Sequence, residues 1–118
     1  MTPPSKINLN KAKTLLTVTF DDIDYDLSAE FLRVYSPSAE VVGHGPGQET
    51  LQVDKEGVTI TNIQPTGNYA IILFFSDGHD TGIYSWNHLH KLATNYDKLW
   101  SEYLEKLQDS GHSHSRIN

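Results

Sequence analysis

Hydrophobic and polar residues alternate along short segments in the first two-thirds of the chain, a pattern typical of half-buried β-strands. Within residues 15–20, Leu16, Val18 and Phe20 fall on one face of such a strand. Two aspartates follow as a turn, and the chain returns over residues 23–27. This order of alternation, turn and alternation predicts a first β-hairpin.

Further strands are expected over residues 50–53, 58–63, 69–75 and 81–85, because glycine-containing turns at 54–57, 65–68 and 76–80 separate these segments. The segment 69–75 is the most apolar run of the chain. A continuous apolar run of this length is typical of a strand covered on both sides, so we expect a central strand there.

Two helices are predicted. Ser28 precedes an acidic turn, which is typical of a helix N-cap, and Pro37 ends this short helix, because the residue before a proline is pushed out of the helical region. Residues 87–109 form a long amphipathic pattern whose apolar stripe comprises Leu89, Leu92, Tyr96, Leu99, Trp100, Tyr103 and Leu107. On this helix we expect His90 to point to solvent and His88 to lie at the border of the stripe.

These elements predict an α+β fold: a small antiparallel, hairpin-rich domain with one short helix and a long C-terminal amphipathic helix packed on the sheet. Residues 1–5 carry two prolines and are expected to be a flexible arm, and residues 6–109 form the single domain. Residues 110–118 are small and polar, so a disordered tail is expected, in which His112 and His114 would bind a metal only weakly.

Composition narrows the functional classes. The chain has 118 residues, with 9 Lys and Arg against 15 Asp and Glu, a net charge of −6. It has no basic patch for nucleic-acid phosphates, so no nucleic-acid partner is expected. The absence of cysteine excludes disulfides and thiolate chemistry by this chain. No apolar run approaches a membrane span or a signal peptide, so we expect a cytoplasmic protein without a membrane partner.

Candidate chemistry lies in two glycine-flanked loops, since loops often carry binding residues. His79 lies between Asp77 and Asp80, which could supply oxygen ligands to a metal or orient the imidazole as a general base. His44 lies between Gly43 and Gly45 in the other loop. The alternative is that both segments are turns, with His79 as a hydrogen-bond partner.

Enzyme motifs are not readable in this sequence. There is no facial triad of an iron oxygenase, no G-x-S-x-G, no H-E-x-x-H and no cysteine nucleophile. The pattern therefore favours a non-catalytic domain over an enzyme.

Five segments, residues 32–40, 43–48, 67–70, 77–86 and 99–100, resemble the gamma-butyrobetaine-hydroxylase-like N-terminal domain family in the same order. The chain looks like a stand-alone, bacterial-type member. The resemblance implies a small α+β domain. The family also occurs at the N-terminus of 2-oxoglutarate oxygenases of carnitine synthesis, and attached to a plant P-loop scaffold protein of iron–sulfur assembly.

In the oxygenases the resembling domain holds zinc through three cysteines and a histidine. Matching the segments places Ser36, Ser38 and Val41 at the cysteine positions and His79 at the histidine position. A serine hydroxyl is a poor zinc ligand and valine is none, so the cysteine zinc site is absent and only His79 carries over.

We therefore expect a non-catalytic accessory or interaction domain linked to iron or iron–sulfur protein biogenesis. It requires no cofactor, although weak zinc or iron binding at His79, with His44 and Asp80, is conceivable. The interaction surface would comprise Gly43, His44, Gly45, Asp77 and Trp86. The protein partner is unknown, and the chain would be a monomer or a homodimer. The alternative is a small-ligand-binding module or small enzyme that uses the loops at 43–48 and 77–81.

Overall fold

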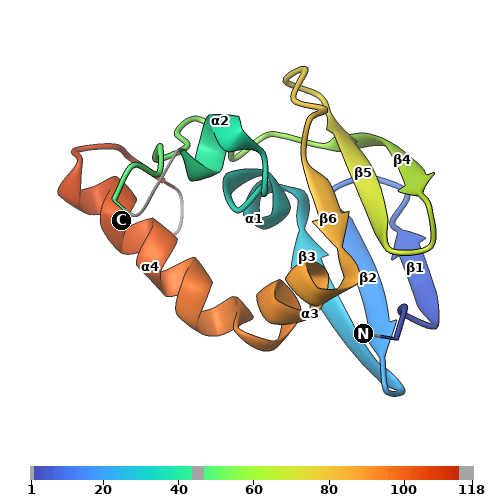
Figure 1. Ribbon diagram of the computed structural model, residues 1–118. Coiled ribbons are helices and arrows are strands. Elements are labelled where there is room, and N and C mark those ends of the chain that lie inside the picture. The colour runs from blue at the N-terminus through green and yellow to red at the C-terminus, as the bar shows by residue number, and fades with distance from the viewer. Residues whose placement is uncertain (1, 44–46, 115–118) are drawn as a thin grey trace.

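The computed structural model describes residues 2–43 and 47–114. Two three-stranded antiparallel sheets lie on one side of the molecule and the helices on the other, as Figure 1 shows. The chain order is three strands, two short helices, three strands and two further helices. This arrangement confirms the predicted α+β class.

The first sheet contains β1 (Lys6–Leu9), β2 (Leu15–Phe20) and β3 (Ile23–Ser28) in that order. The predicted hairpin is confirmed, with Phe20 opposite Ile23 across the turn. Asp21 and Asp22 adopt positive φ angles of 51° and 64°, which a tight two-residue hairpin turn requires of both central residues. The strand β1 has too few residues to show the alternation and was not predicted.

The second sheet has the order β4 (Ile60–Thr66), β5 (Ala70–Phe75) and β6 (Ile83–Ser85). The strand β5 is central, as predicted. Pro65 lies within β4 opposite Ile71, so the prediction that a turn begins at Pro65 is wrong. Because β4 is an edge strand, a proline without an N–H can be accommodated there.

The predicted strand over 50–53 is also wrong, because this segment has no strand structure. Instead Thr50 N–H donates to the carbonyl of Val41 at 2.9 Å. Leu51 and Val53 pack against a small cluster built around Val34, Tyr103 and Leu107. The apolar side chains are therefore covered by helices, and packing with distant residues overrides the local strand preference.

The short helix is confirmed as α1 (Ala29–Val34), with Ser28 Oγ accepting from Phe31 N–H at 3.1 Å. A second short helix, α2 (Ala39–Val42), follows Pro37 and was not predicted. The predicted long helix is two helices, α3 (Trp86–Thr94) and α4 (Tyr96–Asp109). Asn95 leaves the helical conformation between them at φ −115° and ψ 19°, and its side chain donates to the Lys91 carbonyl.

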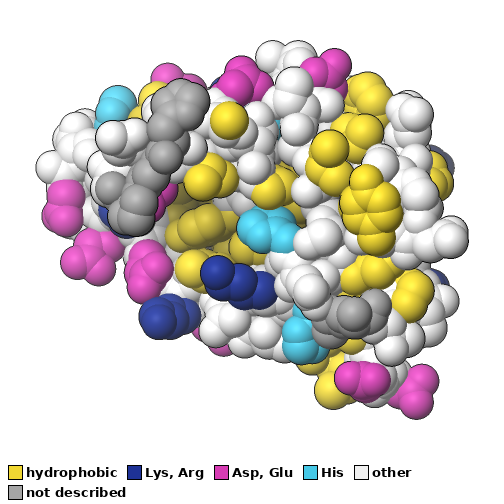
Figure 2. Space-filling model, viewed as in Figure 1, with side chains coloured by type: hydrophobic (Ala, Val, Ile, Leu, Met, Phe, Trp, Pro, Cys, Tyr) yellow, Lys and Arg dark blue, Asp and Glu magenta, His cyan; other side chains and the backbone are white. Residues whose placement is uncertain are grey.

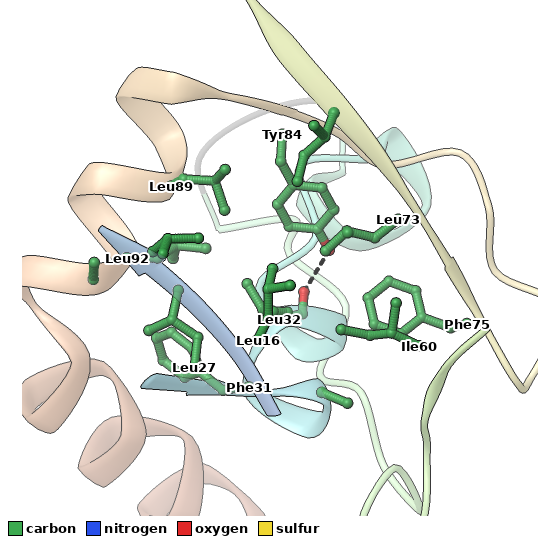
Figure 3. Close-up of a cluster of buried hydrophobic side chains, with 14 of the residues drawn as sticks. Leu16, Leu27, Phe31, Leu32, Ile60, Leu73, Phe75, Tyr84, Leu89 and Leu92 are labelled. Atoms are coloured by element: carbon green, nitrogen blue, oxygen red, sulfur yellow. Dashed lines mark hydrogen bonds between the residues drawn. The ribbon is translucent and has the colours of Figure 1, made fainter. Parts of the chain in front are cut away.

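The main core lies between the two sheets, α1 and α3. Figure 3 shows Leu89 and Leu92 of α3 directed toward Leu16, Leu32 and Tyr84, and all five side chains are buried. Tyr84 satisfies its buried hydroxyl by donating to the carbonyl of Leu32. This bond fixes α1 against β6, which matters because residues just after α1 and residues just before β6 form the polar site described next.

Candidate functional site

The turn between β5 and β6 places His79 in the interior. Asp77 Oδ1 accepts from the backbone N–H of His79 at 3.1 Å, an arrangement that short polar side chains use to build turns. The carbonyl of His79 accepts from Phe75 N–H at 2.9 Å and closes the turn. The His79 side chain is only 3% exposed, so the loop presents its backbone, not its imidazole, to solvent.

Both ring nitrogens of His79 face side chains from the segment after α1. Nε2 lies 2.8 Å from Ser36 Oγ, and Nδ1 lies 3.5 Å from Glu40 Oε1. Burial and the nearby charge of Arg33 lower the pKa of His79, although Glu40 and Asp77 oppose them. A neutral, buried imidazole bonded to a serine is a structural hydrogen-bond partner, and this geometry does not suit a general base that must meet substrate.

The second carboxylate oxygen of Asp77, Oδ2, pairs with two cations and not with the His79 imidazole. It lies 2.9 Å from Arg33 Nε and 2.6 Å from Lys55 Nζ. Burial opposes ionisation of Asp77, but the hydrogen bonds from Lys55, from the His79 backbone and from Arg33 outweigh it and lower the pKa to about 2. Arg33 is buried in α1, so Asp77 supplies the counter-charge that this buried guanidinium needs.

Two of the three positions that the resemblance matches to cysteines, Ser36 and Ser38, lie beside the turn that carries His79, and hydrogen bonds occupy them. Ser36 contacts His79, and Ser38 Oγ lies 2.7 Å from Thr81 Oγ1. Thr81 Oγ1 also donates to Glu40 Oε1 at 2.6 Å. Within residues 2–43 and 47–114, no group of three or more His, Asp or Glu side chains is arranged to hold a metal.

The other predicted site residues are scattered. His44 and Gly45 lie outside the described residues. Asp80 is exposed and makes no side-chain bond to any described residue, whereas Trp86 is half-buried and donates from Nε1 to the Asn68 carbonyl at 2.8 Å. Gly43 ends α2, where a side chain would collide with the carbonyl of Gln48.

Three other histidines take part in packing. His88 Nε2 bonds to the Tyr35 carbonyl at 3.0 Å, and His90 packs edge-on against Phe20 rather than pointing freely to solvent. His114, expected in a disordered tail, is buried and lies 2.8 Å from Glu30 Oε2. Tyr103 donates to the same oxygen at 2.6 Å, so two aromatic donors from the C-terminal part satisfy a buried carboxylate of α1. No local pattern indicated this pairing.

A cavity of about 400 Å³ opens beside these helices and was not predicted. We call it the helix groove; its walls come from the end of α1, from α2, from the segment after it, and from α3 and α4. The lining residues are Val34, Tyr35, Ser36, Val41, Val42, Glu49, Thr50, Leu51, Gln52, His88, Tyr103 and Lys106. Figure 2 shows the hollow with hydrophobic walls, a histidine and a Lys or Arg side chain beside it, and Asp and Glu side chains over α4. Residues 77–81 do not line it, so it is not the pocket expected between the two loops.

A second surface without charged residues is formed by the sheet of β4, β5 and β6. None of the residues in these three strands carries a charge. Ile83 in β6 is 47% exposed, and Tyr69 next to β5 is 59% exposed. Among the described residues, no helix is long and apolar enough to cross a bilayer.

Comparisons with known proteins agree with this architecture. A solution NMR structure matches at 45% identity and a TM-score of 0.84, covering 100% of this chain and 97% of that chain. A second one matches at 44% identity and a TM-score of 0.80, covering 97% and 86%. A crystal structure of a protein of unknown function of the DUF971 family, from Acidithiobacillus ferrooxidans, matches at 35% identity and a TM-score of 0.60, covering 76% and 91%.

None of the functionally curated proteins that we compared matches the chain. The family model described as gamma-butyrobetaine hydroxylase-like, N-terminal, matches residues 7–90, which include the first sheet, both short helices, the second sheet and most of α3. The chain therefore belongs to the gamma-butyrobetaine-hydroxylase-like N-terminal domain family.

Proposed function

We propose that this chain is a non-catalytic accessory domain that binds another protein in the cytoplasm. The observation that carries the proposal is the contrast between its polar residues and its helix groove. The side chains of Asp77 and His79 are bonded to other parts of the fold, whereas the groove presents apolar side chains at the surface. An exposed concave apolar surface is characteristic of a binding site.

A catalytic role has less support. His79 would have to leave Ser36 and the interior before it could accept a proton from a substrate. Asp77 is held by Arg33 and Lys55. The alternative of a ligand pocket between residues 43–48 and 77–81 has less support, because no residue of 77–81 lines the helix groove.

The partner proposed is a protein that handles iron or an iron–sulfur cluster. This part of the proposal rests on the family resemblance, in which the domain is attached to a scaffold of iron–sulfur assembly. The chain has no cysteine, so any cluster would need the partner's thiolates. Of the described residues around this turn, the protein could contribute His79 Nδ1 and Glu40 Oε1, which lie 3.5 Å apart.

The proposal can be tested by site-specific photo-crosslinking in cells, with a photoreactive residue in place of Val42 at the groove or Ile83 at the uncharged sheet. We expect a discrete heterologous protein to be captured from Val42, and iron to be enriched in the purified complex. Crosslinking from Ile83 to a second copy of this chain would indicate a homodimer through the sheet. If neither position captures a protein, the interaction role is wrong.

A further inference from the structure

We propose that two copies of this chain associate through the outer face of the second sheet, which is the face of β4, β5 and β6 that points away from the core. The two sheets would pack face to face across a two-fold axis. This inference goes beyond the proposed function, because it concerns a surface separate from the helix groove, whose lining includes no residue of these strands. It follows from the apolar side chains on the face, from their lack of charge and from the amide groups beside them.

The outer face carries apolar side chains that the core does not use. In β5 every second residue from Ile71 to Phe75 belongs to the main core, so the alternate residues Ile72 and Phe74 point to the other side of the sheet. Both are half-buried, and neither belongs to a hydrophobic cluster of the described residues. Ile83 of β6 lies directly opposite Ile72 and is 47% exposed. These neighbouring side chains form one apolar patch, which we call the sheet patch.

The sheet patch also differs in charge from the chain as a whole. The chain has a net charge of −6, so two copies repel each other wherever their acidic surfaces meet. In contrast, β4, β5 and β6 contain no charged residue, and Asp77 and Asp80 lie in the turn at one end of the sheet. Figure 2 shows hydrophobic side chains gathered over β5 and β6, and Asp and Glu side chains over α4 and around the turn between β2 and β3. Two copies can therefore approach through the sheet patch with little repulsion.

The polar groups beside the sheet patch favour a second copy over a different partner. Gln64 lies opposite Ile72 and Asn62 lies opposite Phe74, so both exposed amides share the outer face. A carboxamide is both a donor and an acceptor, so it can pair with the same group of another copy across a two-fold axis. An ionised carboxylate or an ammonium group cannot do so, because the first only accepts and the second only donates. The outer face is therefore self-complementary, as an interface between two identical surfaces requires.

Packing of the two faces suits this sheet better than pairing of its edges. The strand β4 is one edge, and Pro65 within it has no N–H to donate to an added strand. The other edge, β6, has only 3 residues, which offer a short ladder. Sheets that pack face to face instead lie about 10 Å apart and interdigitate the side chains between them. Ile72, Phe74 and Ile83 of each copy are the side chains that would meet in this way.

The test is sedimentation equilibrium of the full chain from micromolar to millimolar concentration. We expect the mass to rise from that of one chain toward that of two, and the dimer to strengthen as salt is added, because salt screens the repulsion between acidic copies. Ile83→Asp should weaken the association at least about tenfold, since each copy then places a carboxylate in the sheet patch. The control Ile23→Asp makes the same change of charge at an isoleucine of the first sheet that is 54% exposed, and should have little effect. Circular dichroism checks that both variants are folded.

A second variant, Gln64→Glu, tests the amide pairing with almost no change in shape. It should weaken the dimer several-fold, whereas Gln108→Glu at an exposed position of α4 should not. Monomers at every concentration, or equal effects of the two aspartate variants, would overturn the inference. Binding of a monomeric chain to neutral phosphatidylcholine vesicles, lost in Ile83→Asp, would also overturn it, because the sheet patch would then meet a lipid surface. Crosslinking from Val42 tests the helix groove separately, so the two proposals can fail independently.

Discussion

Replacing Asp77 by asparagine should destabilise the protein, because Arg33 would lose its counter-charge. The side chain of Arg33 is 8% exposed, and Asp77 Oδ2 lies 2.9 Å from its Nε. The pKa of Asp77 falls from an ordinary 3.8 to about 2, and this difference corresponds to about 2 kcal/mol. The Asp77 side chain is 23% exposed, so solvent screening reduces this to about 1 kcal/mol.

Asparagine keeps the acceptor oxygen for the turn, so Asp77→Asn isolates the charge. Leaving a buried guanidinium without its partner adds to the loss, and we expect about 1–3 kcal/mol at pH 7. The assay is urea unfolding followed by far-UV circular dichroism and tryptophan fluorescence. Asp80→Asn, at the exposed neighbouring position, should change the free energy of unfolding by less than about 0.5 kcal/mol.

The dependence on pH has a definite sign. A carboxyl whose pKa is lowered by folding contributes stability that is present above its unfolded pKa and is lost as pH falls through its folded pKa. The difference between the wild type and Asp77→Asn should therefore be constant above about pH 5 and shrink between about pH 4 and pH 2. The reasoning is refuted if the two asparagine variants are equally stable at pH 7, or if the difference is unchanged at pH 2.

Three other variants test the polar site and its surroundings. Gly82→Ala should lower the free energy of unfolding by about 2 kcal/mol, because the added Cβ would lie 2.5 Å from Ser36 Oγ. The control is Gly57→Ala, where the added Cβ has open space, and chemical denaturation compares the two variants. Tyr103→Phe should lower the stability measured by thermal unfolding by about 1–3 kcal/mol, because it removes a hydrogen-bond donor from buried Glu30. The control Tyr69→Phe, at an exposed position, should leave the stability almost unchanged. The triple variant Ser36→Cys, Ser38→Cys, Val41→Cys should gain a tetrahedral site with His79, detected as cobalt(II) charge-transfer absorption that the wild type lacks.

Local patterns were sufficient for much of the fold. The alternation over residues 15–20 and the paired aspartates after it predicted a hairpin that the structure contains. Ser28 predicted the start of α1, and the apolar run at 69–75 predicted the central strand of the second sheet. These features depend on neighbours one to four residues apart, so the chain encodes them without reference to its tertiary path.

Local patterns failed where a distant partner determined the structure. The segment 50–53 has the composition of a strand, but its leucine and valine are partly buried against Val34 of α1 and Tyr103 and Leu107 of α4. The stripe over 89–107 continues through Asn95, so the same periodicity suits one helix or two, and only packing against the core distinguishes them.

The candidate site shows the same division. The sequence by itself determined which groups are available: no cysteine, a histidine in a glycine-containing turn, and an acidic balance. Only the tertiary structure decided that His79 bonds Ser36 across 43 residues and that His114 reaches Glu30 across 84. The helix groove likewise exists only because four helices and an irregular segment meet, and no short-range periodicity records which distant surfaces are brought together.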